Sequence, residues 1–265
     1  MKNKVFIDFF ETPSPPAIVF FRLRRALILF HNRIDCITSI LAVQSVLSGR
    51  GISAMGGVIA VEHPLVDHHL TILRDRETPA VLFRQQVKRL ATLLAFQATA
   101  DLPLQSKLIA TPMVQTEGKT LAVRVAIVPI LRAGLGMVEP LQELLPEAEV
   151  WHLGMYRDEQ TATPVEYYCK LPEGKACQVG FVLDPMLATG GSVLAALETL
   201  QRWGCADLRV LSIIAARPGV ERLERLFPNI KIYVAAVDPE LNEHNFIVPG
   251  LGDAGDRIFN TSSGQ

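Results

Sequence analysis

A chain of 265 residues is long enough for one large domain, or for one domain with an appendage. Hydrophobic residues make up 49% of it and charged residues 20%, an ordinary globular balance with ample material for a core. The net charge of −1 argues against a dedicated nucleic-acid binder, which is usually clearly basic. That charge still allows a pocket in which a few cations gather around a phosphate.

Cysteine and histidine usage argues against a disulfide framework or a zinc site. The four cysteines form no CxxC pair, and the six histidines form no HExxH pattern. A reducing cytoplasm fits this cysteine usage best. No uninterrupted apolar run reaches the roughly 18 residues that a membrane-spanning helix needs. The sequence therefore predicts a cytoplasmic protein with no membrane partner and no metal held by its side chains alone.

The chain changes character near Met55. Residues 1–54 carry seven basic and three acidic side chains, whereas residues 55–265 carry 19 basic and 24 acidic ones. We therefore divide the chain into an N-terminal extension, residues 1–54, and a domain, residues 55–265. The extension is open to three interpretations: a targeting peptide, a docking segment, or translated upstream sequence that the natural protein lacks. Its arginines favour targeting, but its three acids are unusual in a transit peptide.

The domain begins with a helix and a hairpin. Thr78 and Pro79 are typical of a helix cap followed by proline at the first helical position. Apolar residues then recur at close to helical spacing, at Val81, Leu82, Val87, Leu90, Leu94 and Ala98. Thr116–Lys119 is expected to be a turn between two short strand-like runs, which predicts a hairpin.

Five short apolar runs follow, each typical of a buried strand: Val125–Ile130, Val150–Met155, Val179–Leu183, Leu208–Ala215 and Ile230–Val237. Between them lie helical stretches or loops, notably Val138–Leu145, Ser192–Trp203 and Val220–Phe227. This alternation predicts an α/β fold, with a mainly parallel sheet flanked by helices. Ligands bind such folds beyond the carboxyl ends of the strands, so we expect the chemistry in those loops.

The strongest single signal runs from Phe181 to Val193. A buried strand leads into Asp184, then into a turn that contains Gly190 and Gly191, and then into a helix. The glycines let backbone amides approach an anion, and a helix N-terminus adds unpaired N–H groups with a favourable dipole. On glycine spacing alone, an ordinary strand-to-helix turn is an equal alternative. The segment matches neither a Walker A loop nor the GxGxxG pattern of a dinucleotide site.

These thirteen residues resemble the signature with which type I phosphoribosyltransferases bind phosphoribosyl pyrophosphate (PRPP). Most of that family has two adjacent acids at the strand end, whereas Asp184-Pro185 is similar to the variant of uracil phosphoribosyltransferases. Four more stretches resemble the same family in the same order: Val128–Gly136, Met155–Asp158, Pro164–Tyr168 and Val248–Arg257. The resemblance extends over about Gly57 to Thr261.

The resemblance implies the type I phosphoribosyltransferase fold, with a small hairpin and a C-terminal base-binding loop. It implies transfer of the phosphoribosyl group of PRPP to N1 of uracil, which yields UMP and pyrophosphate in pyrimidine salvage. The residues that it assigns to PRPP are Arg132, Arg157, Asp184, Pro185, Met186, Leu187, Ala188, Thr189, Gly190, Gly191, Ser192 and Asp253, with Arg132, Arg157 and Asp184 as the catalytic ones. Those that it assigns to uracil are Ile247, Gly252, Asp253 and Ala254.

The residues themselves support part of this assignment. Arg132 follows a buried strand beside Ala133-Gly134, where a guanidinium and exposed amides can hold pyrophosphate together. Arg157 heads a polar stretch, which in the family lies near a closing loop. Mg²⁺ is expected to arrive with PRPP, because it prefers a few carboxylates and substrate oxygens. Uracil and PRPP are then the partners, in a homo-oligomer, with GTP as a candidate effector because it activates some relatives.

One stretch departs from the family pattern, and two other functions compete. The family usually has Ala-Ala-Pro-Glu-Gly-Val where this chain has Ala215-Ala216-Arg217-Pro218-Gly219-Val220, which puts the geometry of that loop in doubt. An RNA-binding regulator built on the same fold would need a basic face, which the acidic balance of residues 55–265 does not indicate. A purine-type transferase would lack the loop from Pro249 to Gly255.

All these site residues lie beyond Met55, so we expect a chain that begins there to fold and to convert uracil to UMP with near-unchanged kcat. Steady-state kinetics and thermal melting of both lengths under identical conditions test this prediction. A shorter chain that is folded but inactive would show that the extension contributes to the site.

Overall fold

The structure is a computed structural model that describes residues 57–157, 164–172, 174 and 176–261. The N-terminal extension and the predicted boundary at Met55 lie outside these residues. Among the described helices, none has both the length and the apolar character that are needed to cross a membrane.

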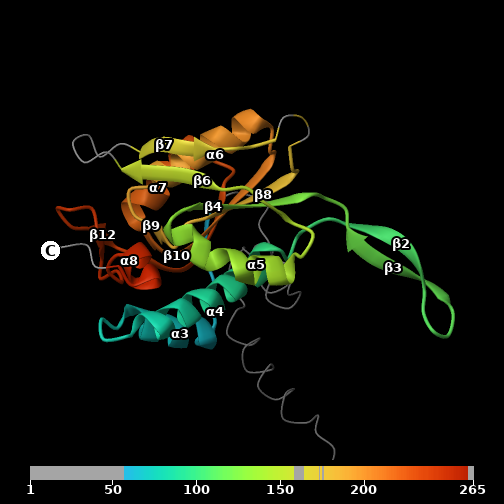
Figure 1. Cartoon of the computed structure of the whole chain (residues 1–265), viewed down its shortest axis with the longest axis horizontal. Helices are drawn as coiled ribbons and strands as arrows, with labels where there is room; N and C mark the ends of the chain where they lie inside the picture. The colour runs from blue at the N-terminus through green and yellow to red at the C-terminus, as the bar shows by residue number, and fades with distance from the viewer. Residues whose placement is uncertain (1–56, 158–163, 173, 175, 262–265) are drawn as a thin grey trace, which may run out of the picture. The chain divides into compact units, whose positions relative to one another are not determined.

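A nine-stranded sheet forms the centre of the described part (Figure 1). Its main path runs through β1 (Gly57–Ala60), β11 (Lys231–Asp238), β10 (Asp207–Ala216), β8 (Val179–Leu183), β4 (Val125–Leu131), β6 (Leu153–Arg157) and β7 (Pro164–Cys169). The short strands β5 (Glu149–Val150) and β9 (Met186–Leu187) pair with β4 and β10. β6 and β7 pair antiparallel, and the other pairs described in this sheet are parallel. The predicted mainly parallel sheet is therefore confirmed.

Two groups of helices cover the two faces of the sheet (Figure 1). One face packs on α3 (Pro64–Arg74), α4 (Ala80–Ala98), the 3-10 helix η1 (Ala133–Met137), α5 (Val138–Leu144) and α8 (Ala254–Phe259). The other packs on α6 (Gly191–Trp203) and α7 (Arg217–Leu226). Successive residues of a strand point to opposite faces, so Ile127 of β4 joins the first core and Val128 the second. The nearly continuous apolar runs of β4 and β8 result from this burial on both faces.

Several predicted boundaries were wrong. α4 begins at Ala80, and Thr78 does not cap it, because the Thr78 hydroxyl donates to the carbonyl oxygen of Ile72 at 2.6 Å. The predicted strand Val150–Met155 is two strands, β5 and β6, since the chain leaves the ladder between them. α7 begins at Arg217, three residues before its predicted start, with proline in its first turn.

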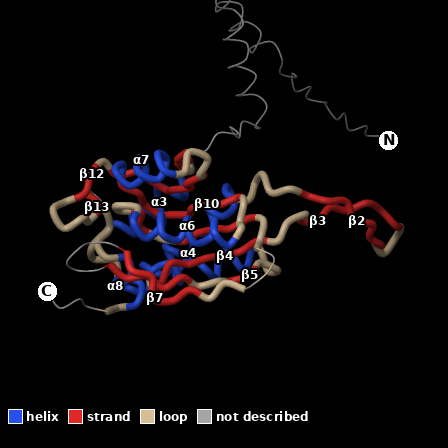
Figure 2. The backbone as a smooth tube through the Cα atoms, turned by 90° about the horizontal axis from the view of Figure 1, so that it is seen from above, coloured by secondary structure: helices blue, strands red, loops and turns tan. Residues whose placement is uncertain are grey.

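The predicted hairpin is present, but its turn was misplaced. β2 (Leu104–Ala110) and β3 (Gln115–Leu121) pair antiparallel, with Gly118 directly opposite Lys107. Thr116–Lys119 therefore lies within a strand, and the turn is at Thr111–Val114. There the Thr111 hydroxyl accepts hydrogen bonds from the amides of Met113 and Val114, which competes with ladder pairing. Figure 2 shows this hairpin extending beyond the sheet and its helices.

A buried ion pair joins α4 to the amino end of β10. The Arg209 side chain is 2% exposed, and its guanidinium bonds the carboxylates of Asp101 and Asp207. The same guanidinium donates to the carbonyl oxygen of Ala98 at 2.6 Å, and Lys231 of β11 bonds the second oxygen of Asp101. This cluster lies at the end of the sheet opposite to the loops in which we expect the chemistry.

Candidate active site

The segment with the strongest sequence signal forms a small cavity at the carboxyl end of β8. Asp184 follows the strand directly, and Gly190, with a φ of +75°, begins α6 from the left-handed region. A cavity of about 50 Å³ is lined by Asp184, Met186, Leu187, Ala188, Thr189, Gly190, Gly191, Ser192 and Val193. The buried Pro185 lies outside this lining, and its carbonyl oxygen accepts from the amides of Ile213 and Ile214 of β10. The loop is thus held to the sheet while its other residues face the cavity.

α7 supports this loop from behind. A Cβ atom on Gly219 would lie 2.1 Å from the carbonyl oxygen of Ala188, so the two backbones approach more closely than any side chain allows. Arg222 donates from Nη1 to the carbonyl oxygen of Thr189 at 3.3 Å. The departure from the family pattern, Arg217-Pro218, falls on two exposed residues at the start of α7. It therefore leaves the glycine that contacts the loop in place.

Arg132 lies in a second loop, at the carboxyl end of the neighbouring strand β4. A Cβ atom on Gly134 would lie 2.4 Å from the carbonyl oxygen of Leu183, so this loop packs tightly against the residue that precedes Asp184. The peptide bond between Leu131 and Arg132 is cis. The Arg132 side chain is 57% exposed, and its Nη2 lies 3.1 Å from Oδ1 of Asp256. A guanidinium is thus available to solvent beside the strand end.

The predicted base-binding loop, residues 247–254, contributes a second and larger cavity. It begins with β13 (Ile247–Val248), which pairs with β12 (Glu240–Leu241), and leads into α8. Asp253 caps this helix, since its Oδ1 accepts from the Asp256 amide at 2.8 Å. A cavity of about 210 Å³ is lined by Met186, Ala188, His244, Asn245, Phe246, Ile247, Gly252 and Asp253. Of the predicted uracil residues, Ala254 is buried and does not line this cavity.

The two cavities share a wall, because Met186 and Ala188 line both. Arg132 and Asp253 also come together, on either side of Gly255, where a Cβ atom would lie 3.5 Å from the arginine and 3.2 Å from the aspartate. The structure therefore gathers residues from three loops that are far apart in the sequence. Arg157 ends β6, whose Leu153 pairs with Ile130 of β4, but its side chain and the loop 158–163 lie outside the described residues.

The sequence reasoning missed the residues between β12 and β13. His244, Asn245 and Phe246 line the larger cavity, and the Asn242 side chain holds their turn by accepting from the amides of His244 and Phe246. Asparagine commonly forms such turns, and Asn245 has a φ of +62°. Asn242 and Asn245 were the sequence signal for a turn here. They carried no information that this turn lies beside the cavity.

The comparisons with known proteins bear on this site directly. The family model described as uracil phosphoribosyltransferase matches residues 60–261. This chain belongs to the uracil phosphoribosyltransferase family. A uracil phosphoribosyltransferase of Roseiflexus sp. (strain RS-1) is 51% identical over 207 residues, which are 78% of this chain and all of that relative. One of Geobacillus kaustophilus is 48% identical over 208 residues, with the same coverage. The solved AQ2163 protein of Aquifex aeolicus is 36% identical, with a TM-score of 0.74 over 78% of this chain and 99% of its own.

As a phosphoribosyltransferase, the chain presents an unusual carboxyl group at the strand end. Burial raises the pKa of Asp184 from its ordinary value to about 7, and the hydrogen bond from the Met186 amide, at 3.3 Å, opposes this rise only in part. A substrate hydroxyl or cation beside Asp184 would favour the ionised form. The group is therefore poised to change its charge near neutral pH.

The donor set near Asp184 fits a magnesium ion that arrives with the substrate. Among the described residues, no three or more histidine, cysteine, aspartate or glutamate side chains gather as metal ligands. Asp184 supplies one carboxylate, and Mg²⁺ commonly combines one or two carboxylates with substrate phosphates and water. Asp184 is thus the residue of this loop that could meet such an ion.

We expect Asp184→Asn to lower kcat/KM for PRPP at least tenfold, a loss of about 1.4 kcal/mol or more in transition-state stabilisation. In the wild-type enzyme kcat/KM for PRPP should rise with pH through about 7, because the carboxylate forms there. Asp184→Asn should lose this pH dependence, which steady-state kinetics between pH 5.5 and 8.5 measure.

The stability of the fold should fall as the pH rises, in contrast to kcat/KM for PRPP, which should increase. The folded pKa of Asp184 lies above its ordinary value of 3.8, so the stabilisation that is full below about pH 4 is lost as the pH rises through about 7. Thermal melting should therefore show a smaller loss of stability between pH 4 and 7 in Asp184→Asn than in the wild type. Glu139→Gln, which removes a surface carboxylate paired with Lys88, is the control and should change neither profile.

Proposed function

We propose that the protein transfers the phosphoribosyl group of PRPP to N1 of uracil and releases UMP and pyrophosphate. The observation that carries the proposal is the shared wall of the two cavities, since it puts a phosphate-sized space beside a larger one at the same strand ends. Membership of the uracil phosphoribosyltransferase family supports the same reaction. Both substrates are small soluble molecules, and we propose the cytoplasm as the location.

The smaller cavity is the proposed site of the 5′-phosphate of PRPP. The first amides of α6 have no carbonyl partner within the helix, and the helix dipole favours an anion there. Thr189 and Ser192 add hydroxyl donors at the same place. Asp184, at the other end of the cavity, accepts hydrogen bonds from the ribose hydroxyls. The ribose then extends towards Met186 and Ala188, which leads into the larger cavity.

The larger cavity is the proposed site of uracil, between Ile247 and the segment Gly252–Ala254. Beside the reacting N1, uracil presents two carbonyl acceptors and the N3–H donor along its edges, and main-chain groups of a loop can pair with these three groups. Asp253 lies where the two substrates meet, beside Arg132. Main-chain recognition of this kind needs a loop whose backbone is rigidly held.

The reaction forms the bond between N1 and the anomeric carbon while the bond from that carbon to pyrophosphate breaks. The electron pair of the broken bond leaves with pyrophosphate, and uracil releases its N1 proton to the surrounding water. Arg132, and Arg157 from the neighbouring strand, offset the charge that grows on the leaving group. Mg²⁺ bound to PRPP supplies further positive charge there. The two cavities hold the reacting atoms in line, which lowers the entropic part of the barrier.

The test of the proposed function is the formation of UMP from labelled uracil, PRPP and Mg²⁺. We expect uracil and 5-fluorouracil to react and cytosine to fail, because the 4-amino donor of cytosine would face an N–H group that normally receives a carbonyl oxygen. A buried mismatch of this kind leaves two donors unpaired and discriminates by a factor of about 10⁴. Comparable turnover of cytosine would contradict the base site. Addition of GTP to the same assay tests GTP as an effector.

Arg132→Ala should weaken the binding of PRPP and of pyrophosphate much more than the binding of uracil, since the guanidinium faces the leaving group. Isothermal titration with each ligand, together with KM values in both reaction directions, measures the difference. Equal weakening for uracil and PRPP would instead indicate a general folding defect. Arg76→Ala is a matched control, because Arg76 is 92% exposed and lies in the turn after α3.

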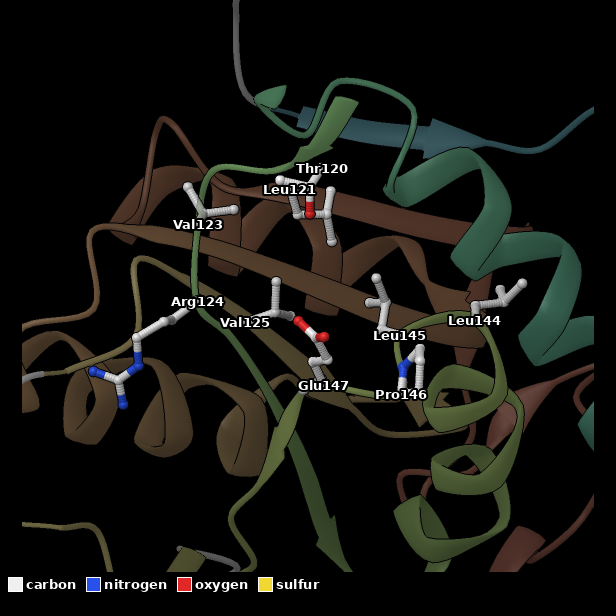
Figure 3. A pocket seen from close by; sticks show the side chains of 10 residues that line it. Thr120, Leu121, Val123, Arg124, Val125, Leu144, Leu145, Pro146 and Glu147 are labelled. Atoms are coloured by element: carbon white, nitrogen blue, oxygen red, sulfur yellow. The ribbon is translucent and has the colours of Figure 1, made fainter. Parts of the chain in front are cut away.

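We also propose that the enzyme is a homo-oligomer whose subunits meet at the hairpin. Leu104, Leu108 and Leu121 lie on one face of the hairpin, and they are 56%, 71% and 37% exposed. Leu121 also lines a groove of about 290 Å³ at the base of the hairpin (Figure 3), whose apolar lining further includes Val123, Val125, Leu144, Leu145, Pro146 and Ala148. An apolar face that continues into an apolar groove fits a second copy of itself across a two-fold axis.

Leu108→Glu should shift the protein towards the monomer, because it buries a charge wherever two such faces meet. Sedimentation velocity across a concentration series measures the shift. Lys107→Glu, which changes the charge of the neighbouring position on the opposite face of the strand, is the control. An unchanged sedimentation coefficient in Leu108→Glu would place the contact elsewhere.

A further inference from the structure

Two arginines and one aspartate fix the main chain of the base-binding loop, residues 247–254. Asp238 ends β11, and its side chain is only 6% exposed. Arg74, the last residue of α3, donates from Nη2 to Oδ1 of Asp238 at 2.6 Å and from Nη1 to Oδ2 at 2.8 Å. This is a bidentate and largely buried ion pair between a helix and a strand end.

The pair holds both polar groups of one residue in the loop. The amide of Gly250 donates to Oδ2 of Asp238 at 3.0 Å, and the carbonyl oxygen of Gly250 accepts from Nη1 of Arg74 at 2.7 Å. Gly250 has a φ of +62°, and a Cβ atom there would lie 2.0 Å from the carbonyl oxygen of Ile247. The ion pair therefore stabilises a turn that is too tight for any other residue type.

A third side chain secures the next residue of the loop. Arg257 of α8 donates from Nη1 to the carbonyl oxygens of Leu251, at 2.8 Å, and of Leu73, at 2.9 Å. Its Nη2 donates to the carbonyl oxygen of Asp75 at 2.6 Å, and its guanidinium lies 4.3 Å from the ring centre of Phe83. Leu251 is followed by Gly252 and Asp253, which line the larger cavity.

A buried charged pair is a costly way to add stability, because desolvation offsets much of its attraction. It does, however, favour one geometry strongly, since any displacement of the loop leaves a buried carboxylate or guanidinium unpaired. The loop must offer main-chain groups to a small planar base, so a preorganised backbone is what recognition requires.

We propose that Asp238, Arg74 and Arg257 are positioning residues that set the affinity and selectivity for the pyrimidine base by fixing the main chain of residues 247–254. The proposal rests on the proposed function, because it takes this loop to be the base site. If the loop leaves its binding geometry for part of the time, the apparent affinity for uracil falls in proportion to the competent fraction. PRPP meets this loop at Asp253, which also caps α8 and is held there independently of Asp238, and it otherwise binds on the other loops, so its KM changes little.

The experiment uses Asp238→Asn in the full-length protein. The asparagine can still accept from the Gly250 amide but loses its charge opposite Arg74. We expect KM for uracil to rise at least tenfold and the preference for uracil over cytosine to fall, while KM for PRPP stays within twofold and kcat at saturating uracil changes little. Arg74→Lys keeps the positive charge but loses the bidentate geometry, so it should produce a smaller rise and serves if Asp238→Asn folds poorly.

Asp101→Asn is the matched control, because it removes a carboxylate from the other buried arginine pair, that of Arg209 at the opposite end of the sheet. It should lower the melting temperature and leave both KM values unchanged. A purely structural role for Asp238 would give this same result, and that outcome would overturn the proposal. So would an equal rise of both KM values in Asp238→Asn and Arg74→Lys.

Hydrogen exchange without substrates separates this proposal from the proposed function. Asp238→Asn should speed exchange of the amides of Gly250 and Leu251, and Asp101→Asn should not. Unchanged exchange at these amides in Asp238→Asn would overturn the proposed fixing of the loop. Failure of the wild-type protein to form UMP would overturn the proposed reaction and with it the proposed base selectivity. In that case, faster exchange of Gly250 and Leu251 in Asp238→Asn would still demonstrate that the ion pair fixes the loop.

Discussion

The close approach of backbones at the carboxyl ends of the central strands governs the geometry of this molecule. At Gly134 the loop after β4 touches the last carbonyl group of β8, and at Gly219 the start of α7 touches the carbonyl group of Ala188. A single methyl group at either position would separate surfaces that now lie in contact. Because the loop after β8, residues 184–190, lies between these two contacts, its backbone amides have little freedom to move. Small residues, and not catalytic side chains, thus determine where the chemistry can occur.

The charged groups of the site are of two kinds. One is fixed in a buried ion pair, and the others lie where a substrate can change their protonation or their partner. Asp238 is paired and fixed by Arg74, so its charge stabilises structure. Asp184 faces a cavity, and burial raises its pKa to about 7. Arg132 is more than half exposed and its guanidinium pairs with Asp256 in the first turn of α8, near the surface where an anion would arrive. A transferase that binds a highly charged substrate and releases two charged products gains from groups that change their partners readily.

The sequence predicted the sheet and the glycine-containing turn between β8 and α6 well, since both depend on local patterns. An apolar run buried on both faces and a glycine-containing turn before a helix can be recognised without knowing what packs around them. The hairpin turn was misplaced because Gly118 suggested a turn, whereas the Thr111 side chain stabilises one at Thr111–Val114, earlier in the chain. The role of Arg74 was invisible, because its partners Asp238 and Gly250 lie more than 160 residues away. Contacts of this kind arise from the fold as a whole.

The start of α7 shows how unevenly structural constraint is distributed along a chain. Arg217 and Pro218 face solvent, while the next residue, Gly219, touches the backbone of Ala188 in the loop after β8. Three consecutive positions thus differ sharply in the substitutions that they tolerate. Arg217 and Pro218 can be replaced without affecting the loop, whereas position 219 admits no side chain. An unfamiliar pair of residues inside a recognisable motif is therefore weak evidence for altered chemistry. The constraint in this motif is the absence of a side chain at Gly219. In a deep mutational scan of α7, the tolerance to substitution should therefore rise abruptly within one residue of the glycine.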